Sequence, residues 1–219
     1  MHRRFTAYTI SLFILVSLCG FSQKLKIVDK PIIWNDKRNQ LSVEYLKERH
    51  GLEQKDPTIV PIMVVCHWTA IPTLEKSFQA FESPTLPNWR PELKNASQLN
   101  VSAHYLVDRD GTVYHLMPDT ILARHVIGLN YCAIGIENVG DGSNNKLTEA
   151  QFKANYLLIK RLSKKYNIQY LIGHHEYKKF RGSTIWKETD PNYLTVKSDP
   201  GDEFMNRLRK KFKKLKKEP

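Results

Sequence analysis

Two short, strongly apolar segments place the tightest limits on how this 219-residue chain can fold. Residues 59–68 (IVPIMVVCHW) and 132–139 (CAIGIENV) are rich in β-branched side chains. Apolar runs of this length are typical of buried strands, because buried helices are usually longer. We therefore expect both segments in a central sheet that other elements cover.

Four further segments have the capping residues or the apolar spacing of helices. They begin near Leu41, Thr73, Thr148 and Asp202. Two alternating runs, 103–107 and 112–116, flank a turn that ends in Asp110-Gly111 and predict a hairpin, and residues 169–173 predict another strand. Strands that alternate with helices predict the α/β class, here a single domain with a mixed central β-sheet and helices packed on it.

The N-terminus has the layout of a secretory signal peptide. Three polar or basic residues at 2–4 precede an uncharged, mostly apolar stretch at 5–18, and small residues stand at Gly20 and Ser22. We expect export to the periplasm or secretion, with lipid anchoring through Cys19 as the alternative. The expected organisation is a signal peptide at 1–22, an N-terminal extension at 23–58, a globular domain at 59–206 and a basic C-terminal tail at 207–219.

The net charge of +12 is concentrated near the C-terminus, where eight basic residues lie between Arg207 and Lys217. A basic segment attracts polyanions, which include nucleic acid, anionic lipid and anionic wall polymer. The export signal and the lack of a nucleic-acid motif argue against nucleic acid. We expect a monomer whose tail makes peripheral contact with the wall or a membrane surface.

Two cysteines, Cys66 and Cys132, remain after removal of the signal peptide. An exported protein can pair its cysteines. Both residues lie in apolar runs, so we expect two buried thiols instead of a disulfide.

Histidine residues stand where strands are expected to end. His67 ends the first apolar strand, His174 and His175 follow residues 169–173, and Asp199 lies in the turn before the last helix. Sheet proteins commonly place their sites at such strand ends. Two imidazoles and one carboxylate can hold zinc and leave a fourth position for water. Taken singly, such residues more often make a structural hydrogen bond or a turn, and the spacing alone does not favour a metal site because it contains no compact His-x-x-x-His motif.

Six short motifs follow one another between residues 59 and 204. They are VCHWT (65–69), VSAHY with DRDG (101–111), ARH (123–125), AIGIE (133–137), GHHE (173–176) and KSDPG (197–201). In residues and in order, they resemble the zinc-dependent N-acetylmuramoyl-L-alanine amidases, which share their fold with peptidoglycan recognition proteins. The resemblance implies hydrolysis of the amide bond between the lactyl group of N-acetylmuramic acid and L-alanine, in peptidoglycan or in muropeptides.

The resemblance also implies a zinc ion held by His67, His174 and Asp199. His175 is excluded as a ligand by the family's Gly-His-x-acid pattern. Adjacent strand residues point to opposite faces, which agrees with this choice. The same alternation separates Cys66 from His67, so we expect no thiol nucleophile.

Further roles follow from the same motifs. Glu137 would orient the attacking water and transfer its proton to the leaving amine, and Lys197 would stabilise the oxyanion of the tetrahedral intermediate. His125, Arg124 and Asn130 would bind the muropeptide.

A peptidoglycan-binding module without activity is the alternative function. Relatives of that kind typically lose a metal ligand while they keep the groove. This chain retains all three ligand positions together with Glu137 and Lys197, which favours catalysis. Some relatives have a tyrosine where this chain has Ala103, so the sequence groups with members that rely on the glutamate.

Overall fold

The computed structural model describes residues 24–88, 93 and 96–219. The predicted signal peptide, with Cys19, therefore lies outside the described residues. Within the described part, no helix combines the length and the apolar character that crossing a membrane requires.

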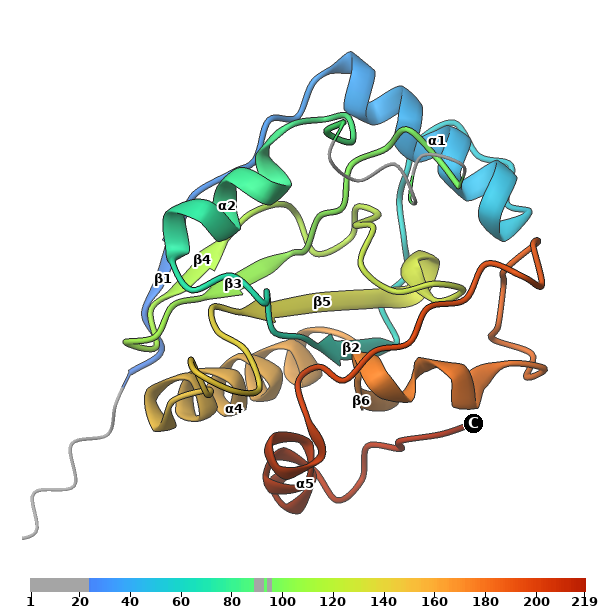
Figure 1. Ribbon diagram of the computed structural model, residues 1–219. Helices are drawn as coiled ribbons and strands as arrows, with labels where there is room; N and C mark the ends of the chain where they lie inside the picture. Colours follow the sequence, from blue (N-terminus) through green and yellow to red (C-terminus); the bar gives the residue numbers. More distant parts are fainter. Residues whose placement is uncertain (1–23, 89–92, 94–95) are drawn as a thin grey trace, which may run out of the picture.

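The described strands form one mixed, six-stranded sheet in the order β1-β4-β3-β5-β2-β6 (Figure 1). Its strands are β1 (Ile27–Asp29), β2 (Met63–Cys66), β3 (Tyr105–Val107), β4 (Val113–His115), β5 (Ala133–Asn138) and β6 (Tyr170–Gly173). The β3 and β4 strands pair antiparallel, as the predicted hairpin requires, and the other neighbouring strands pair parallel. The predicted α/β fold with a mixed central sheet is confirmed.

Helices cover the sheet on both sides. The helices α4 (Glu149–Lys165) and α5 (Asp202–Lys211) lie on one side, and α1 (Asp36–His50) and α2 (Leu74–Glu82) lie on the other (Figure 1). Side chains alternate along β2, so Val64 and Cys66 pack toward α4 and α5 whereas Met63 and Val65 pack against Tyr177 and its neighbours. The apolar run at 59–68 is buried because both faces of its strand are covered.

The helix starts follow local hydrogen bonding. The predicted capping box at Thr148 is present, with the Thr148 side chain accepting from Gln151 N and the Gln151 side chain accepting from Thr148 N. Thr73 caps α2 as predicted. By contrast, α1 begins five residues before Leu41, because the Asn35 side chain caps it by accepting from the backbone N–H of Arg38.

The N-terminal extension is part of the same folded unit. Strand β1 pairs with β4, and Lys30 N and Ile32 N continue the pairing by donating to the carbonyls of His115 and Leu116. In α1, Arg38 is 1% exposed and donates to the carbonyls of Phe81, Glu82 and Ser83 at the end of α2. The segment expected to precede the main domain as an extension thus supplies a strand and a 15-residue helix of the same fold.

The basic C-terminal tail is ordered against the sheet. The expected boundary at residue 207 falls inside α5, and Arg209 donates to the buried carboxylate of Glu176 at 2.7 Å. Beyond the helix, Lys216 accepts from Leu171 N and donates its own N–H to the carbonyl of Gln169, so the backbone runs beside β6. Six exposed lysines remain along this segment: Lys210, Lys211, Lys213, Lys214, Lys216 and Lys217.

Both described cysteines are free and buried, as predicted. Burial raises the pKa of Cys66 to about 12 and that of Cys132 to about 12, so both stay thiols at neutral pH. Cys66 points toward α4, where its Sγ lies 4.0 Å from Asn155 Oδ1.

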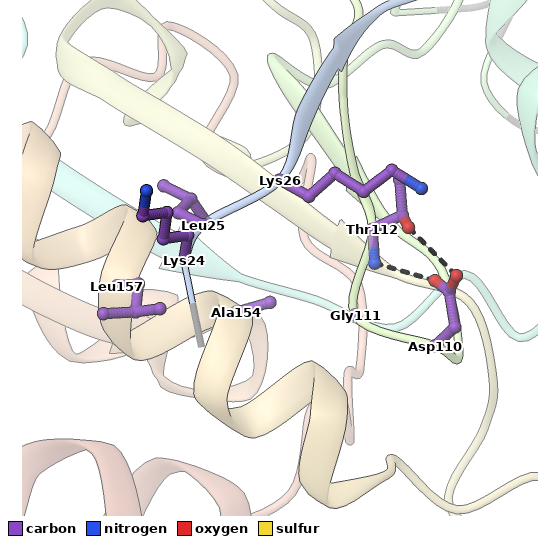
Figure 2. A pocket seen from close by; sticks show the side chains of 8 residues that line it. All are labelled: Lys24, Leu25, Lys26, Asp110, Gly111, Thr112, Ala154 and Leu157. Carbon is purple, nitrogen blue, oxygen red and sulfur yellow. Dashed lines mark hydrogen bonds between the residues drawn. The ribbon is translucent and has the colours of Figure 1, made fainter. Parts of the chain in front are cut away.

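A shallow hollow of about 250 Å³ lies between the start of β1, the hairpin turn and α4 (Figure 2). The Asp110 carboxylate holds the turn by accepting from the backbone N–H and the hydroxyl of Thr112. Gly111 has a φ of 86°, and a Cβ there would lie 2.8 Å from the carbonyl oxygen of Ala150. This glycine lets the turn approach α4.

Acid should destabilise the fold through His104, which is fully buried in the core. Its Nδ1 accepts from Gly135 N, its Nε2 donates to the carbonyl of Ile121, and burial lowers its pKa to about 4. The unfolded chain binds this proton near pH 6.5, so stability should be complete above that pH and fall by up to about 1.4 kcal/mol per unit toward pH 4. Denaturant unfolding across this range, with an NMR titration of the imidazole, tests the expectation. A His104 that titrates near 6.5 would contradict it.

Candidate metal centre

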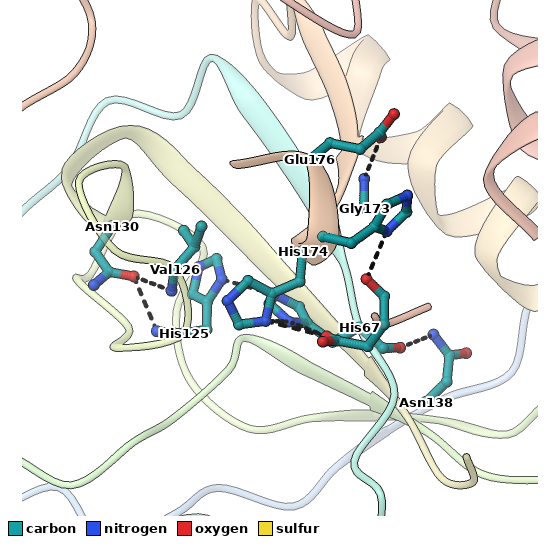
Figure 3. Close-up of polar contacts among 10 residues, drawn as sticks. His67, His125, Val126, Asn130, Asn138, Gly173, His174 and Glu176 are labelled. Carbon is teal, nitrogen blue, oxygen red and sulfur yellow. Dashed lines mark hydrogen bonds and ion pairs between the residues drawn. The ribbon is translucent and has the colours of Figure 1, made fainter. Parts of the chain in front are cut away.

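Three buried side chains that are far apart in the sequence meet at one edge of the sheet. His67 Nδ1 lies 2.9 Å from His174 Nδ1, and each of these nitrogens lies 3.1 Å from Asp199 Oδ2. Figure 3 shows the two imidazoles turned toward this point. The structure therefore brings together the three residues that the sequence motifs single out as ligands.

The sheet topology places the two histidines. His67 and His174 directly follow β2 and β6, which are parallel neighbours, so their carboxyl ends lie side by side. The ladder continues through His67, whose N–H donates to Ile136 O and whose carbonyl accepts from the backbone and the side-chain amide of Asn138. Asn155 of α4 donates in turn to Asn138 Oδ1 at 2.6 Å. The position of His67 is thus fixed by the sheet and the helix beneath it.

The third residue, Asp199, comes from the turn before α5. His175 holds this turn, because its backbone N–H donates to the Asp199 carbonyl at 3.0 Å and its ring Nδ1 lies 2.9 Å from the same oxygen. The predicted division of labour between the adjacent histidines follows: His174 faces the cluster, and His175 binds the backbone behind it.

The cluster has the dimensions of a zinc site. Zinc lies about 2.0–2.2 Å from nitrogen and oxygen ligands, which places ligand atoms about 3.4 Å apart in a tetrahedron. The three observed separations of 2.9, 3.1 and 3.1 Å need only a slight expansion to reach this value. His67, His174 and Asp199 are 1%, 7% and 8% exposed, so their convergence is shielded from bulk water. The residues present fit a small divalent cation.

The electrostatics of the cluster favour its metal-binding protonation states. Burial raises the pKa of Asp199, but the close contacts of its carboxylate with the His174 and His67 imidazoles outweigh burial and leave that pKa well below its usual range. Burial and the neighbouring His67 lower the pKa of His174 to about 4. At neutral pH the cluster therefore presents a carboxylate and a neutral His174, the forms that coordinate metal.

A cavity of about 380 Å³ opens beside the cluster. Its walls include His174, Asp199, Glu137 and Lys197. Glu137 is half-buried on β5, on the same strand face as Gly135, and Lys197 is exposed on the segment that leads to Asp199. The two side chains predicted to be catalytic thus share one cavity with two of the predicted ligands.

His125 lines the same cavity and lies against His67 of the cluster. Its Nδ1 is 3.0 Å from Nε2 of His67 (Figure 3). Its Nε2 is 3.3 Å from the carbonyl of Ala133. Burial lowers its pKa well below the ordinary value, so the ring is neutral.

Arg124 and Asn130 hold the loop that carries His125. The Arg124 guanidinium is 3% exposed and donates to four oxygens: the carbonyls of Leu93, Ser97 and Leu99 and the hydroxyl of Tyr193. Asn130 Oδ1 accepts from the backbone N–H groups of His125 and Val126, and its Nδ2 donates to Tyr45. The structure thus gives both residues a loop-holding role, and their contact with substrate stays a prediction.

Two features of the site escape the sequence motifs. Helix α1 anchors the segment that leads to Lys197, because Arg49 contacts the buried carboxylate of Glu188 at 2.5 Å and its carbonyl accepts from Thr189 N. The Trp68 indole lines the cavity and contacts Gly142, where a Cβ would lie only 2.4 Å from the ring. Neither contact carries a local sequence signal, because the partners are separated by more than 70 residues.

Comparison with solved structures defines the class of the fold. LysC, an N-acetylmuramoyl-L-alanine amidase from Clostridium intestinale URNW, is 20% identical with a TM-score of 0.54, covering 87% of this chain and 99% of that chain. The endolysin amidase LysCS from the same organism is 19% identical with a TM-score of 0.55, covering 89% and 99%. Drosophila peptidoglycan recognition protein SD is 14% identical with a TM-score of 0.53, covering 89% and 99%. The fold is that of amidases and peptidoglycan recognition proteins.

The sequence profile of the N-acetylmuramoyl-L-alanine amidases matches residues 56–202, and this chain belongs to that family. Among curated protein sequences, none matches it. Its activity is that of an N-acetylmuramoyl-L-alanine amidase, a hydrolase of an amide bond, so the predicted amidase family and activity are confirmed, whereas zinc dependence stays a prediction.

Proposed function

We propose that the amidase is zinc-dependent and that His67, His174 and Asp199 hold the ion. The observation that carries this proposal is the convergence of two imidazole nitrogens and one carboxylate oxygen within about 3 Å of one another. Zinc in such a site supplies Lewis acidity and lowers the pKa of a water to about 7. The amidase hydrolyses the amide bond between the lactyl group of N-acetylmuramic acid and L-alanine, in peptidoglycan or its muropeptide fragments.

Glu137 acts as the proton carrier in this proposal. It stands on β5, whose backbone pairs with β2 on one side and β3 on the other, so its carboxylate is held at the cavity wall. A carboxylate in this place can orient the attacking water, accept its proton and deliver that proton to the L-alanine nitrogen as the amide bond breaks.

Lys197 stabilises the oxygen of the scissile carbonyl. It precedes Asp199 by two residues and lines the same cavity. Its ammonium can approach the carbonyl oxygen as negative charge develops there, and such stabilisation acts mainly on the transition state.

A non-catalytic peptidoglycan-binding role is the second candidate for this fold. It predicts the loss of at least one ligand or catalytic group. His174 and Asp199 line one cavity together with Glu137 and Lys197, and His67 completes the cluster beside them, which favours turnover.

Export and wall contact complete the proposal. The N-terminal signal layout supports a periplasmic or secreted protein. Six lysines of the C-terminal tail are exposed, and the backbone of one of them, Lys216, pairs with β6. This supports peripheral contact of the tail with an anionic wall or membrane surface.

Replacing Asp199 with alanine should abolish both zinc binding and muropeptide hydrolysis. The change removes the only carboxylate of the cluster, so zinc affinity should fall by at least ~100-fold. Metal analysis and mass spectrometry of digested muropeptides, with and without a chelator, measure the two effects. Asp29→Ala, an exposed substitution on β1, serves as the control. An Asp199→Ala enzyme with full activity would refute the ligand assignment.

Lys197→Met should keep zinc bound and lower kcat by about 10²–10³, the usual effect of losing one oxyanion donor. KM should change little, because the lost interaction forms in the transition state. Steady-state kinetics on a defined muropeptide provide the test, with the exposed Lys178→Met as the matched control. An unchanged kcat would remove Lys197 from the mechanism.

Replacing Lys210, Lys211, Lys213, Lys214 and Lys217 with glutamine should weaken retention on cell-wall sacculi at low salt. The effect should shrink as salt is raised, because the attraction is electrostatic. Lys216 is left in place because its ammonium lies over the Tyr170 ring of β6, 5.8 Å from the ring centroid. Co-sedimentation with sacculi and with DNA measures binding. Unchanged retention on sacculi would show that the tail does not contribute to wall binding.

A further inference from the structure

His67 uses both of its ring nitrogens. Nδ1 faces His174 and Asp199, and Nε2 faces Nδ1 of His125 at 3.0 Å. The rings of His67 and His125 meet edge to face, with centroids 5.1 Å apart. His125 therefore contacts the His67 ring on the side opposite the cluster.

Hydrogen bonds link His67 to His125 and His125 to the carbonyl of Ala133. The carbonyl fixes which group donates in each of them. The carbonyl of Ala133 only accepts, so His125 Nε2, at 3.3 Å, must carry a proton and donate it. A neutral imidazole carries one proton, so a His125 ring with its proton on Nε2 has a lone pair on Nδ1, which accepts from His67 Nε2–H across the 3.0 Å contact. With its proton on Nε2, His67 presents an unprotonated Nδ1 to the cluster. This is the tautomer that a metal ligand needs.

The surrounding structure is built to hold His125 in this place. Gly135 leaves the space that its ring fills, because a Cβ on Gly135 would lie 2.8 Å from two ring atoms of His125. Asn130 Oδ1 accepts from the backbone N–H of His125 at 2.9 Å. The ring is thus fixed by packing on one side and by its loop on the other.

We infer that His125 is a positioning residue, which fixes the tautomer and the ring orientation of the metal ligand His67. The inference rests on the proposed zinc site and deepens it. It replaces direct muropeptide binding as the main role of His125. Outer partners of this kind typically change metal affinity by about 10–100-fold when they are removed.

The decisive experiment compares His125→Ala, His125→Asn and His125→Gln. The side-chain amide of asparagine can place an oxygen near the position of Nδ1, whereas that of glutamine reaches the position of Nε2. Competition titration with a chelating dye measures zinc affinity, and circular dichroism with thermal melting confirms that each variant folds. We expect a loss of about 10–100-fold in His125→Ala and His125→Gln, and recovery in His125→Asn. His115→Ala, which removes a half-exposed imidazole from β4, is the control and should bind zinc like the wild type.

Long-range proton–nitrogen NMR of the zinc-loaded wild type gives an independent readout. The expected protons are on Nε2 of His67 and on Nε2 of His125. A proton on Nδ1 of His125 would overturn the inference, because that nitrogen would then donate instead of accepting.

Kinetics separate the positioning role from substrate binding. Loss of a substrate contact would raise KM and leave zinc affinity unchanged, and that pattern in His125→Ala would overturn the inference. If His125→Ala matched the wild type in zinc affinity and in kinetics, the inference would also be overturned, but the proposed zinc-dependent function would stand. If the wild type itself bound no zinc, both the proposed cofactor and this inference would fall.

Discussion

The parallel pairing of β2 with β5 on one side and β6 on the other is the constraint on which the site depends. It aligns the carboxyl ends of neighbouring strands, so that residues from three distant parts of the chain reach one edge. His67 and His174 follow two of these strands, and Glu137 stands near the end of the third. Side chains alternate along β2, so Cys66 points to the sheet face opposite His67, toward α4. The same strand therefore contributes to the apolar core and to the polar site.

Most of the fold could be predicted from local sequence signals. The parts that depend on contacts between distant residues could not. The capping box at Thr148 and the short apolar strands are defined by neighbouring residues, and both appear in the structure as expected. Strand β1 has only three residues and no fully buried side chain, so it shows no alternation that could be recognised. The start of α1 has a local signal in the Asn35 cap, but the first turn has no apolar spacing, because its buried residue is the charged Arg38. The carbonyls that accept from Arg38 lie more than 40 residues away.

The same distinction applies to the site. Spacing alone could not show that two histidines and an aspartate meet; the order of the family motifs supplied that expectation, and the geometry now supports it. The loop-holding bonds of Arg124 and Asn130 could not be predicted, because their partners are mostly backbone groups, which every residue possesses. For the same reason the sequence offered no sign that α1 steadies the segment before Lys197 through Arg49.

The strand-like contact between Lys216 and β6 gives the last residues a second importance. Without it, the N–H of Leu171 and the carbonyl of Gln169 would face outward along the open side of an apolar strand. Exposed edge strands of this kind pair with other chains and form intermolecular sheets. A shortened protein that ended at α5 would therefore be prone to self-association even with its catalytic groups intact. Affinity tags are better appended after Pro219 than exchanged for this segment.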